Sequence, residues 1–155
     1  MDEVSKTIKK HKRKKYILKI EDTSGNEQFI KEIKKSCDTT NFAVLVFDIT
    51  KKDTFISIKS WLEKCELCSN EDIILILIGN KKDLAKTREI SPEEIEQFAK
   101  GYNMKYYEIS AFNDKDVKNI FEEECKNFID NYSKNLAKST VLKNIGNSNI
   151  ILLIY

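Results

Sequence analysis

The sequence contains very little glycine and proline: four glycines and one proline in 155 residues. This scarcity excludes collagen-like, linker-rich and low-complexity architectures. Long hydrophobic runs are also missing. The longest runs have six residues, at Phe42–Phe47, at Ile73–Ile78 and at the C-terminus, whereas a membrane-spanning helix needs about 20. No apolar segment follows the basic N-terminal residues, so we expect no secretory signal and a cytoplasmic location.

An excess of charge of either sign is absent as well. The 27 Lys and Arg residues and the 25 Asp and Glu residues leave a net charge of +2, and we expect no nucleic-acid partner. The hydrophobic fraction of 41% is enough for one domain with a core. We predict a basic polar segment at 1–15, a folded domain at 16–135 and a C-terminal tail at 136–155. The basic run Lys9–Lys15 is typical of a solvated turn or tail, with a lipid or nucleic-acid patch as the alternative.

Residues that bind metals or carry redox chemistry are few, with four cysteines and one histidine. Cys65 and Cys68 form a CxxC pair, but Cys37 and Cys125 are isolated and His11 lies among lysines. A structural zinc site needs four ligands, usually as two such pairs. Cys65 continues the apolar spacing of the residues before it, which favours the inner face of a helix over a zinc or redox site.

Four short apolar segments are predicted as strands: Tyr16–Ile20, Phe42–Phe47, Ile73–Ile78 and Tyr106–Ile109. The second and third are apolar throughout, as is typical of strands covered on both faces in a parallel sheet. Helical patterns separate the strands and follow the last one: Phe55–Cys65, a helix capped by Ser91 that starts at Pro92 and stops at Gly101, and Val117–Tyr132. This alternation predicts an α/β fold with a mostly parallel sheet and flanking helices.

Polar loops follow three of the predicted strands: Asp22–Glu27, Gly79–Leu84 and Ser110–Phe112. Ligands of open α/β sheets bind beyond the carboxyl ends of the strands. We therefore expect these three loops to open on one edge of the sheet and to form the functional site.

The three loops resemble the nucleotide-binding motifs of Ras-like small GTPases. Asp22–Asn26 is similar to their DTAGQ motif, Asn80–Asp83 matches their NKxD guanine motif, and Glu108–Ala111 resembles their ETSA motif. Phe47–Thr50, with the aromatic residues that follow it, resembles the Rab branch in particular. The similarity covers about residues 16–132.

Three motifs in order, each just after a strand, are far more specific than any one of them. Taken singly, Asp83 and Ser110 are also common residues of turns and helix caps. The resemblance implies a Ras-like P-loop NTPase fold, with GTP or GDP and Mg²⁺ as cofactors.

For the base, the resemblance assigns the Asp83 carboxylate to two guanine N–H groups. Adenine does not present both donors in that geometry, so the acceptors would be left unmet. It also assigns the Lys81 stem to stacking on the base and Asn80 to bracing the neighbouring loops.

The third loop is implied to contact the base as well. The resemblance assigns the Ala111 N–H to the guanine oxygen, with Ser110 holding the loop. Phe112 stands where the family has a lysine that packs on the base, and a phenyl ring can stack in that place.

On the phosphate side, the resemblance implies that Asp22 holds Mg²⁺ through a water and that the Gly25 N–H meets the γ-phosphate. Asn26 stands where the family has a catalytic, water-orienting glutamine. Asparagine is one methylene shorter, so its amide falls short of the attacking water and slow hydrolysis is expected.

No segment matches GxxxxGK[ST], the phosphate-binding P-loop, and 21 residues precede Asp22. The resemblance therefore implies that the chain lacks the family's first strand and P-loop. It also implies that 1–15 is a remnant of the family's first switch and a hairpin, with the basic residues around Arg13 in the hairpin turn. The missing first strand lies centrally in the family's sheet, so we expect damage to the fold and impaired nucleotide binding and hydrolysis. Three interpretations stay open: a fragment of a Rab-like guanine-nucleotide switch in vesicle trafficking, a non-enzymatic pseudo-GTPase interaction module, or a hydrolase with a different phosphate cradle.

The resemblance also bears on partners and place in the cell. It implies guanine nucleotide and Rab-type effectors and regulators as partners of a monomer, peripheral to endomembranes. The segment Ile150–Tyr155 contains no cysteine. We therefore expect no prenyl-mediated membrane anchoring.

Overall fold

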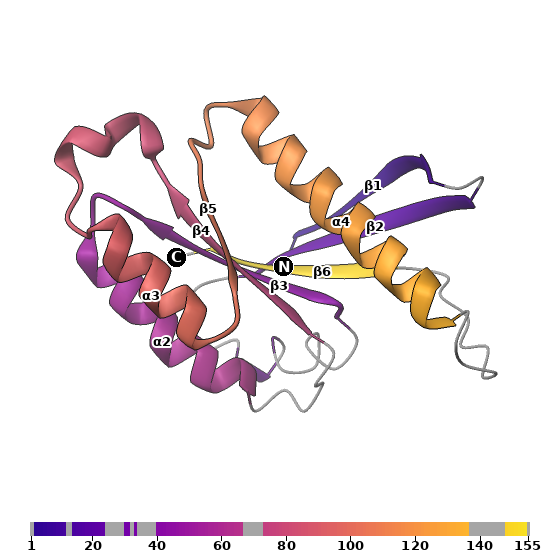
Figure 1. Cartoon of the computed structure of the whole chain (residues 1–155), viewed down its shortest axis with the longest axis horizontal. Coiled ribbons are helices and arrows are strands. Elements are labelled where there is room, and N and C mark those ends of the chain that lie inside the picture. The colour runs from indigo at the N-terminus through magenta and orange to yellow at the C-terminus, as the bar shows by residue number, and fades with distance from the viewer. Residues whose placement is uncertain are drawn as a thin grey trace.

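The computed structural model describes residues 2–11, 14–23, 30–31, 33, 40–66, 73–136 and 148–154, and Figure 1 shows its ribbon. Its elements are β1 (Asp2–His11), β2 (Lys14–Thr23), β3 (Phe42–Asp48), α2 (Lys52–Glu66), β4 (Ile74–Asn80), a 3₁₀ helix (Lys82–Thr87), α3 (Pro92–Gly101), β5 (Lys105–Glu108), α4 (Asp114–Leu136) and β6 (Ser148–Ile154). The predicted strands correspond to β2, β3, β4 and β5, and the predicted helices to α2, α3 and α4.

The strands form one six-stranded sheet in the order β1-β2-β6-β3-β4-β5. β1 and β2 pair antiparallel, and every other neighbouring pair is parallel. The predicted α/β class with a mostly parallel sheet is therefore confirmed.

β6 lies in the centre of this sheet, between β2 and β3. Ile150 is in register with Ile20 on one side and with Phe42 on the other. A strand from the predicted C-terminal tail therefore takes the central position, which the sequence analysis did not anticipate. The expected damage to the fold stays a prediction.

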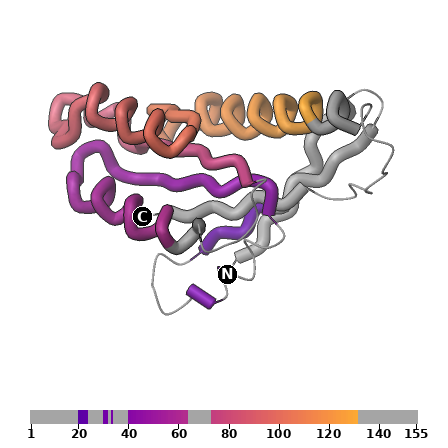
Figure 2. The backbone as a smooth tube through the Cα atoms, turned by 60° about the horizontal axis from the view of Figure 1, so that its bottom comes forward, coloured from indigo at the N-terminus to yellow at the C-terminus, as the bar shows by residue number. Residues whose placement is uncertain are grey.

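Helices cover both faces of the sheet. Along β3, Leu45 and Phe47 belong to the core packed against α2 and α3, whereas Phe42, Val44 and Val46 belong to the core packed against α4. Figure 1 shows α2 and α3 together and α4 apart from them. In the second view, α2 and α4 lie on opposite sides of β3 (Figure 2). All seven residues of β3 are buried, as expected for the apolar run Phe42–Phe47 in a strand covered on both faces.

The start of α3 follows its predicted capping signals. The Ser91 side chain accepts a hydrogen bond from the Glu94 N–H at 3.1 Å, and Pro92 takes the first helical position. The helix ends at Gly101, as predicted. None of the helices in the described part of the chain is long and apolar enough to cross a membrane.

Of the four cysteines, the structure describes the side chain of Cys125, and the packing interpretation of Cys65 stays a prediction. Cys125 is buried on α4, and burial raises the pKa of its thiol to about 12. Cys65 falls in the last turn of α2. Cys37, Cys68 and the side chain of Cys65 lie outside what the structure describes.

Candidate functional site

The parallel strands bring the described parts of the predicted loops to one edge of the sheet. β2, β3, β4 and β5 all run in the same direction, so their carboxyl ends lie together. This edge holds Asp22 near the end of β2, Asp48 at the end of β3 and Asn80 at the end of β4. The arrangement is the one in which α/β sheets bind ligands.

Asn80 joins the loop after β4 to the loop after β5. Its Oδ1 accepts hydrogen bonds from the Lys81 N–H at 2.8 Å and from the Ala111 N–H at 2.9 Å. The backbone adds a bond from Lys82 N–H to the Ile109 carbonyl at 3.0 Å. The two loops that the resemblance assigns to guanine therefore form one hydrogen-bonded unit.

The Ala111 N–H already has an acceptor in this unit. A guanine oxygen that accepts from the same N–H must share it with the Asn80 side chain or replace that side chain. Ser110 stabilises the loop, because it is buried and its Oγ accepts a hydrogen bond from the Phe112 N–H at 3.4 Å. The Phe112 ring is 92% exposed, which places a large apolar surface at the rim of the unit.

Lys81 adopts a conformation that few non-glycine residues use. Its φ of 67° and ψ of 36° are left-handed. Its ammonium forms a 2.6 Å ion pair with Asp48 Oδ2, from the neighbouring strand. The sequence analysis did not name Asp48 as a site residue. The available signal was an acidic residue at the end of a buried strand, at the same sheet edge as the guanine motif.

The environment of Asp48 keeps it charged. Burial by itself raises the pKa of this carboxyl, but hydrogen bonds from Lys81 and Thr50 and the charge of Lys81 outweigh burial and lower the pKa below its ordinary value. Thr50 contributes two of these bonds to Oδ1, from its N–H at 2.9 Å and from its hydroxyl at 2.7 Å.

Asp83 lies in the first turn of the 3₁₀ helix, and its side chain is exposed. An exposed carboxylate can accept hydrogen bonds from a ligand without first breaking a buried contact. This placement agrees with the acceptor role predicted for Asp83, which stays a prediction.

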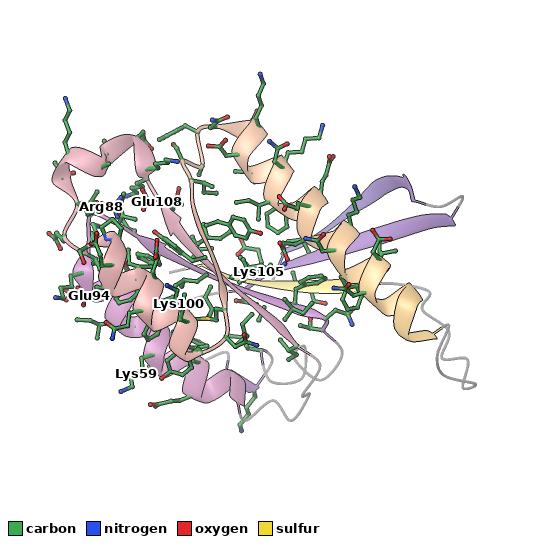
Figure 3. All side chains as sticks on the ribbon, in the orientation of Figure 1. Lys59, Arg88, Glu94, Lys100, Lys105 and Glu108 are labelled. Atoms are coloured by element: carbon green, nitrogen blue, oxygen red, sulfur yellow. The ribbon has the colours of Figure 1, made fainter. Side chains whose placement is uncertain are left out.

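A second polar cluster supports the unit from β5. Arg88, just after the 3₁₀ helix, donates to Glu108 Oε1 at 2.6 Å, and the Tyr106 hydroxyl donates to Glu108 Oε2 at 2.8 Å. Figure 3 labels Arg88 and Glu108 side by side. Glu108 directly precedes the buried Ile109–Ser110 pair, so this cluster anchors the start of the third loop.

The phosphate side of the predicted site is described only at Asp22. This residue is exposed near the end of β2, in register with Asp2 and Leu152. Gly25 and Asn26 lie outside the described residues. Among the side chains that the structure describes, no group of three or more His, Cys, Asp or Glu could hold a metal ion.

Comparisons with known proteins agree with the motifs. The family model described as "Ras family" matches residues 1–130. Ras-related protein Rab-21 of Bos taurus is 35% identical over 117 residues, which cover 76% of this chain and 53% of the relative; for Rab-21 of Homo sapiens the values are 35%, 76% and 52%. Ras-related protein Rab-2B of Dictyostelium discoideum is 34% identical over 131 residues, 84% of this chain and 63% of that protein. The chain thus spans about half the length of the Rab-21 proteins it matches.

Proposed function

This chain belongs to the Ras family, and from that membership and the geometry of its sheet edge we propose that it is a Rab-like guanine-nucleotide-binding protein. The observation that carries the proposal is the bridge made by Asn80. It holds Lys81 and Ala111 in one unit next to the exposed Asp83. A carboxylate acceptor and an N–H donor held in one unit complement the donor and acceptor edge of guanine.

Mg²⁺ belongs to the phosphate side of the proposed site. Asp22 fits this ion chemically, because Mg²⁺ prefers oxygen ligands and is usually held by one or two carboxylates, phosphate oxygens and water. When bound, Mg²⁺ neutralises charge on the phosphate oxygens. Asp22 would supply an exposed carboxylate near the end of β2, on the same sheet edge as the hydrogen-bonded loops after β4 and β5.

As a Rab-like protein, the chain would act as a switch in vesicle trafficking, with effectors and regulators of the Rab type and a location peripheral to endomembranes. The support is the similarity to Rab-21 and Rab-2B. The alternative is a non-enzymatic interaction module, which is favoured by the lack of a GxxxxGK[ST] segment in the 155 residues. Single-turnover hydrolysis of bound GTP separates the two, because the module would bind guanine nucleotide without cleaving it.

The experiment that tests base recognition is the variant Asp83→Asn. The amide keeps one acceptor and adds a donor, so GDP should bind at least about tenfold more weakly, and the preference for GDP over XDP should fall. Competition titrations with GDP, XDP and ADP measure this preference.

Glu96→Gln is the matched control, since it removes an exposed carboxylate from α3, where the side chain of Glu96 is 58% exposed. It should leave base selectivity unchanged. If Asp83→Asn also leaves selectivity unchanged, Asn80–Asp83 is an ordinary turn and the proposal is wrong.

A further inference from the structure

Lys81 is fixed at both ends of its length. At the backbone, its N–H donates to Asn80 Oδ1 at 2.8 Å and its carbonyl accepts from the Leu84 N–H at 2.8 Å. At the tip, its ammonium lies 2.6 Å from Asp48 Oδ2. The side chain is nevertheless 42% exposed. The alkyl stem therefore lies between two anchored ends, at the edge where the proposed base would bind.

The anchor at the tip is itself buried and held by several hydrogen bonds. The Asp48 side chain is 9% exposed, and its second oxygen is held by both the N–H and the hydroxyl of Thr50. The Asp48 N–H donates to the Thr54 hydroxyl at 3.0 Å. Asp48 is also in register with Asn80, the residue before Lys81. These hydrogen bonds fix the orientation of the carboxylate that pairs with the Lys81 ammonium.

We propose that Asp48 is a positioning residue for base binding: by holding the Lys81 ammonium, it fixes the lysine stem in the place where the base stacks. This inference rests on the proposed function, since the stacking role of Lys81 comes from the family resemblance. A free lysine side chain loses rotamer freedom when a ligand immobilises it, and a lysine that is already held loses less. This difference in the entropic cost of binding corresponds to about 2- to 12-fold in affinity for the base.

The test is a double-mutant cycle between Asp48→Asn and Lys81→Met, with Mg²⁺–GDP as the probe. Methionine keeps an unbranched apolar stem and needs no anion as a partner. With Lys81 present, Asp48→Asn should weaken GDP binding by about 3- to 10-fold. In the Lys81→Met background the same change should alter affinity less than about twofold, because Asp48 no longer has a lysine to hold.

An equal loss in both backgrounds would show that Asp48 only supports the fold, and tighter binding by Asp48→Asn would show that the ion pair competes with nucleotide. Either result overturns the proposal. A readout without ligand is the NMR relaxation of the Lys81 side chain in the full chain. Its terminal carbon should move faster after Asp48→Asn, and unchanged relaxation contradicts the proposed hold.

Thr50→Val serves where Asp48→Asn does not fold. It removes one of the bonds that fix Asp48 and keeps the charge, so GDP should bind more weakly by a smaller factor, again only with Lys81 present. Asp83→Asn in the same titrations separates the two hypotheses. If it weakens GDP but the Asp48 and Thr50 variants do not, only the positioning role fails. If the unmodified chain shows no guanine selectivity, the proposed function fails with it.

Discussion

Gly79, near the end of β4, occupies a tightly packed backbone position next to the proposed site. A Cβ at this residue would lie 3.0 Å from Ile49 Cγ2, 3.0 Å from the Tyr106 hydroxyl and 3.2 Å from Phe47 Cζ. The Tyr106 hydroxyl cannot move away freely, because it donates to Glu108. A glycine lets the backbone of β4 approach these three side chains.

Gly79→Ala should therefore lower the free energy of unfolding by about 1–3 kcal/mol, the usual cost of forcing extra volume into a packed site. Urea denaturation measures it. Gly101→Ala is the matched control, since a Cβ there meets no atom within 4 Å and the residue ends α3. It should leave stability unchanged or raise it by up to about 1 kcal/mol. Equal effects of the two changes would contradict the packing argument.

At the residue scale, sequence reasoning identified candidate side chains that belong to a sequence motif. It missed a candidate side chain that only a contact in the folded structure reveals. Asn80, Lys81, Asp83 and Ala111 stand together in the structure, because their spacing from the strand ends determines where they lie. Asp48 went unnamed as a site residue, since its part depends on an ion pair with Lys81, 33 positions further along the chain, and no local pattern encodes such a pair.

At the scale of elements, Arg88 and Glu108 connect the segment before α3 to β5. Their side chains are 17% and 18% exposed. Burial alone would raise the pKa of Glu108, but the bonds from Arg88 and Tyr106 and the Arg88 charge hold it below its ordinary value of 4.5. A carboxyl with a lowered pKa in the folded state stabilises the fold above the ordinary pKa, and this stabilisation is lost as the pH falls through the lowered value.

Glu108→Gln should therefore reduce the free energy of unfolding at pH 7 by about 1–3 kcal/mol, because it leaves a largely buried guanidinium without its anion. The difference from the unmodified chain should shrink as the pH falls below 4.5. Denaturation at a series of pH values measures it. Glu122→Gln removes an exposed partner 3.9 Å from Lys118 and should cost less than about 0.5 kcal/mol. A difference for Glu108→Gln that stays constant down to acidic pH would contradict the linkage.

Sequence patterns predicted the helices and strands that are determined by their own neighbouring residues. β3 and β4 are apolar runs of strand length, and α3 carries its own start and stop signals, so neighbouring residues suffice to predict them. The hydrophobic pattern did not predict β1, because its sequence is mostly polar; only the family resemblance implied a hairpin there, and β1 pairs with β2. β6 was missed for a different reason: its apolar run was visible, but which strands it pairs with depends on the whole fold.

At the scale of the whole molecule, β6 connects two parts of the sheet that share no other described strand. β2 pairs with β1 and β6 among the described strands, and β3 pairs with β4 and β6. Without β6, the β1–β2 hairpin would lose its only described sheet neighbour, and isolated two-stranded hairpins are marginally stable at best. The β3–β5 part keeps its own helices and cores.

Leu152→Pro should separate these two parts. Leu152 is in register with Asp22 on β2 and Val44 on β3, and proline in a central strand removes a ladder N–H. Amide hydrogen exchange should show lost protection along β1 and β2, with more protection kept along β4 and β5. Ser148→Pro is the control, because the first residue of a strand tolerates proline. Unchanged protection of β2 in Leu152→Pro would mean that β6 does not hold the hairpin. Uniform loss over all strands would mean that the sheet unfolds as one unit.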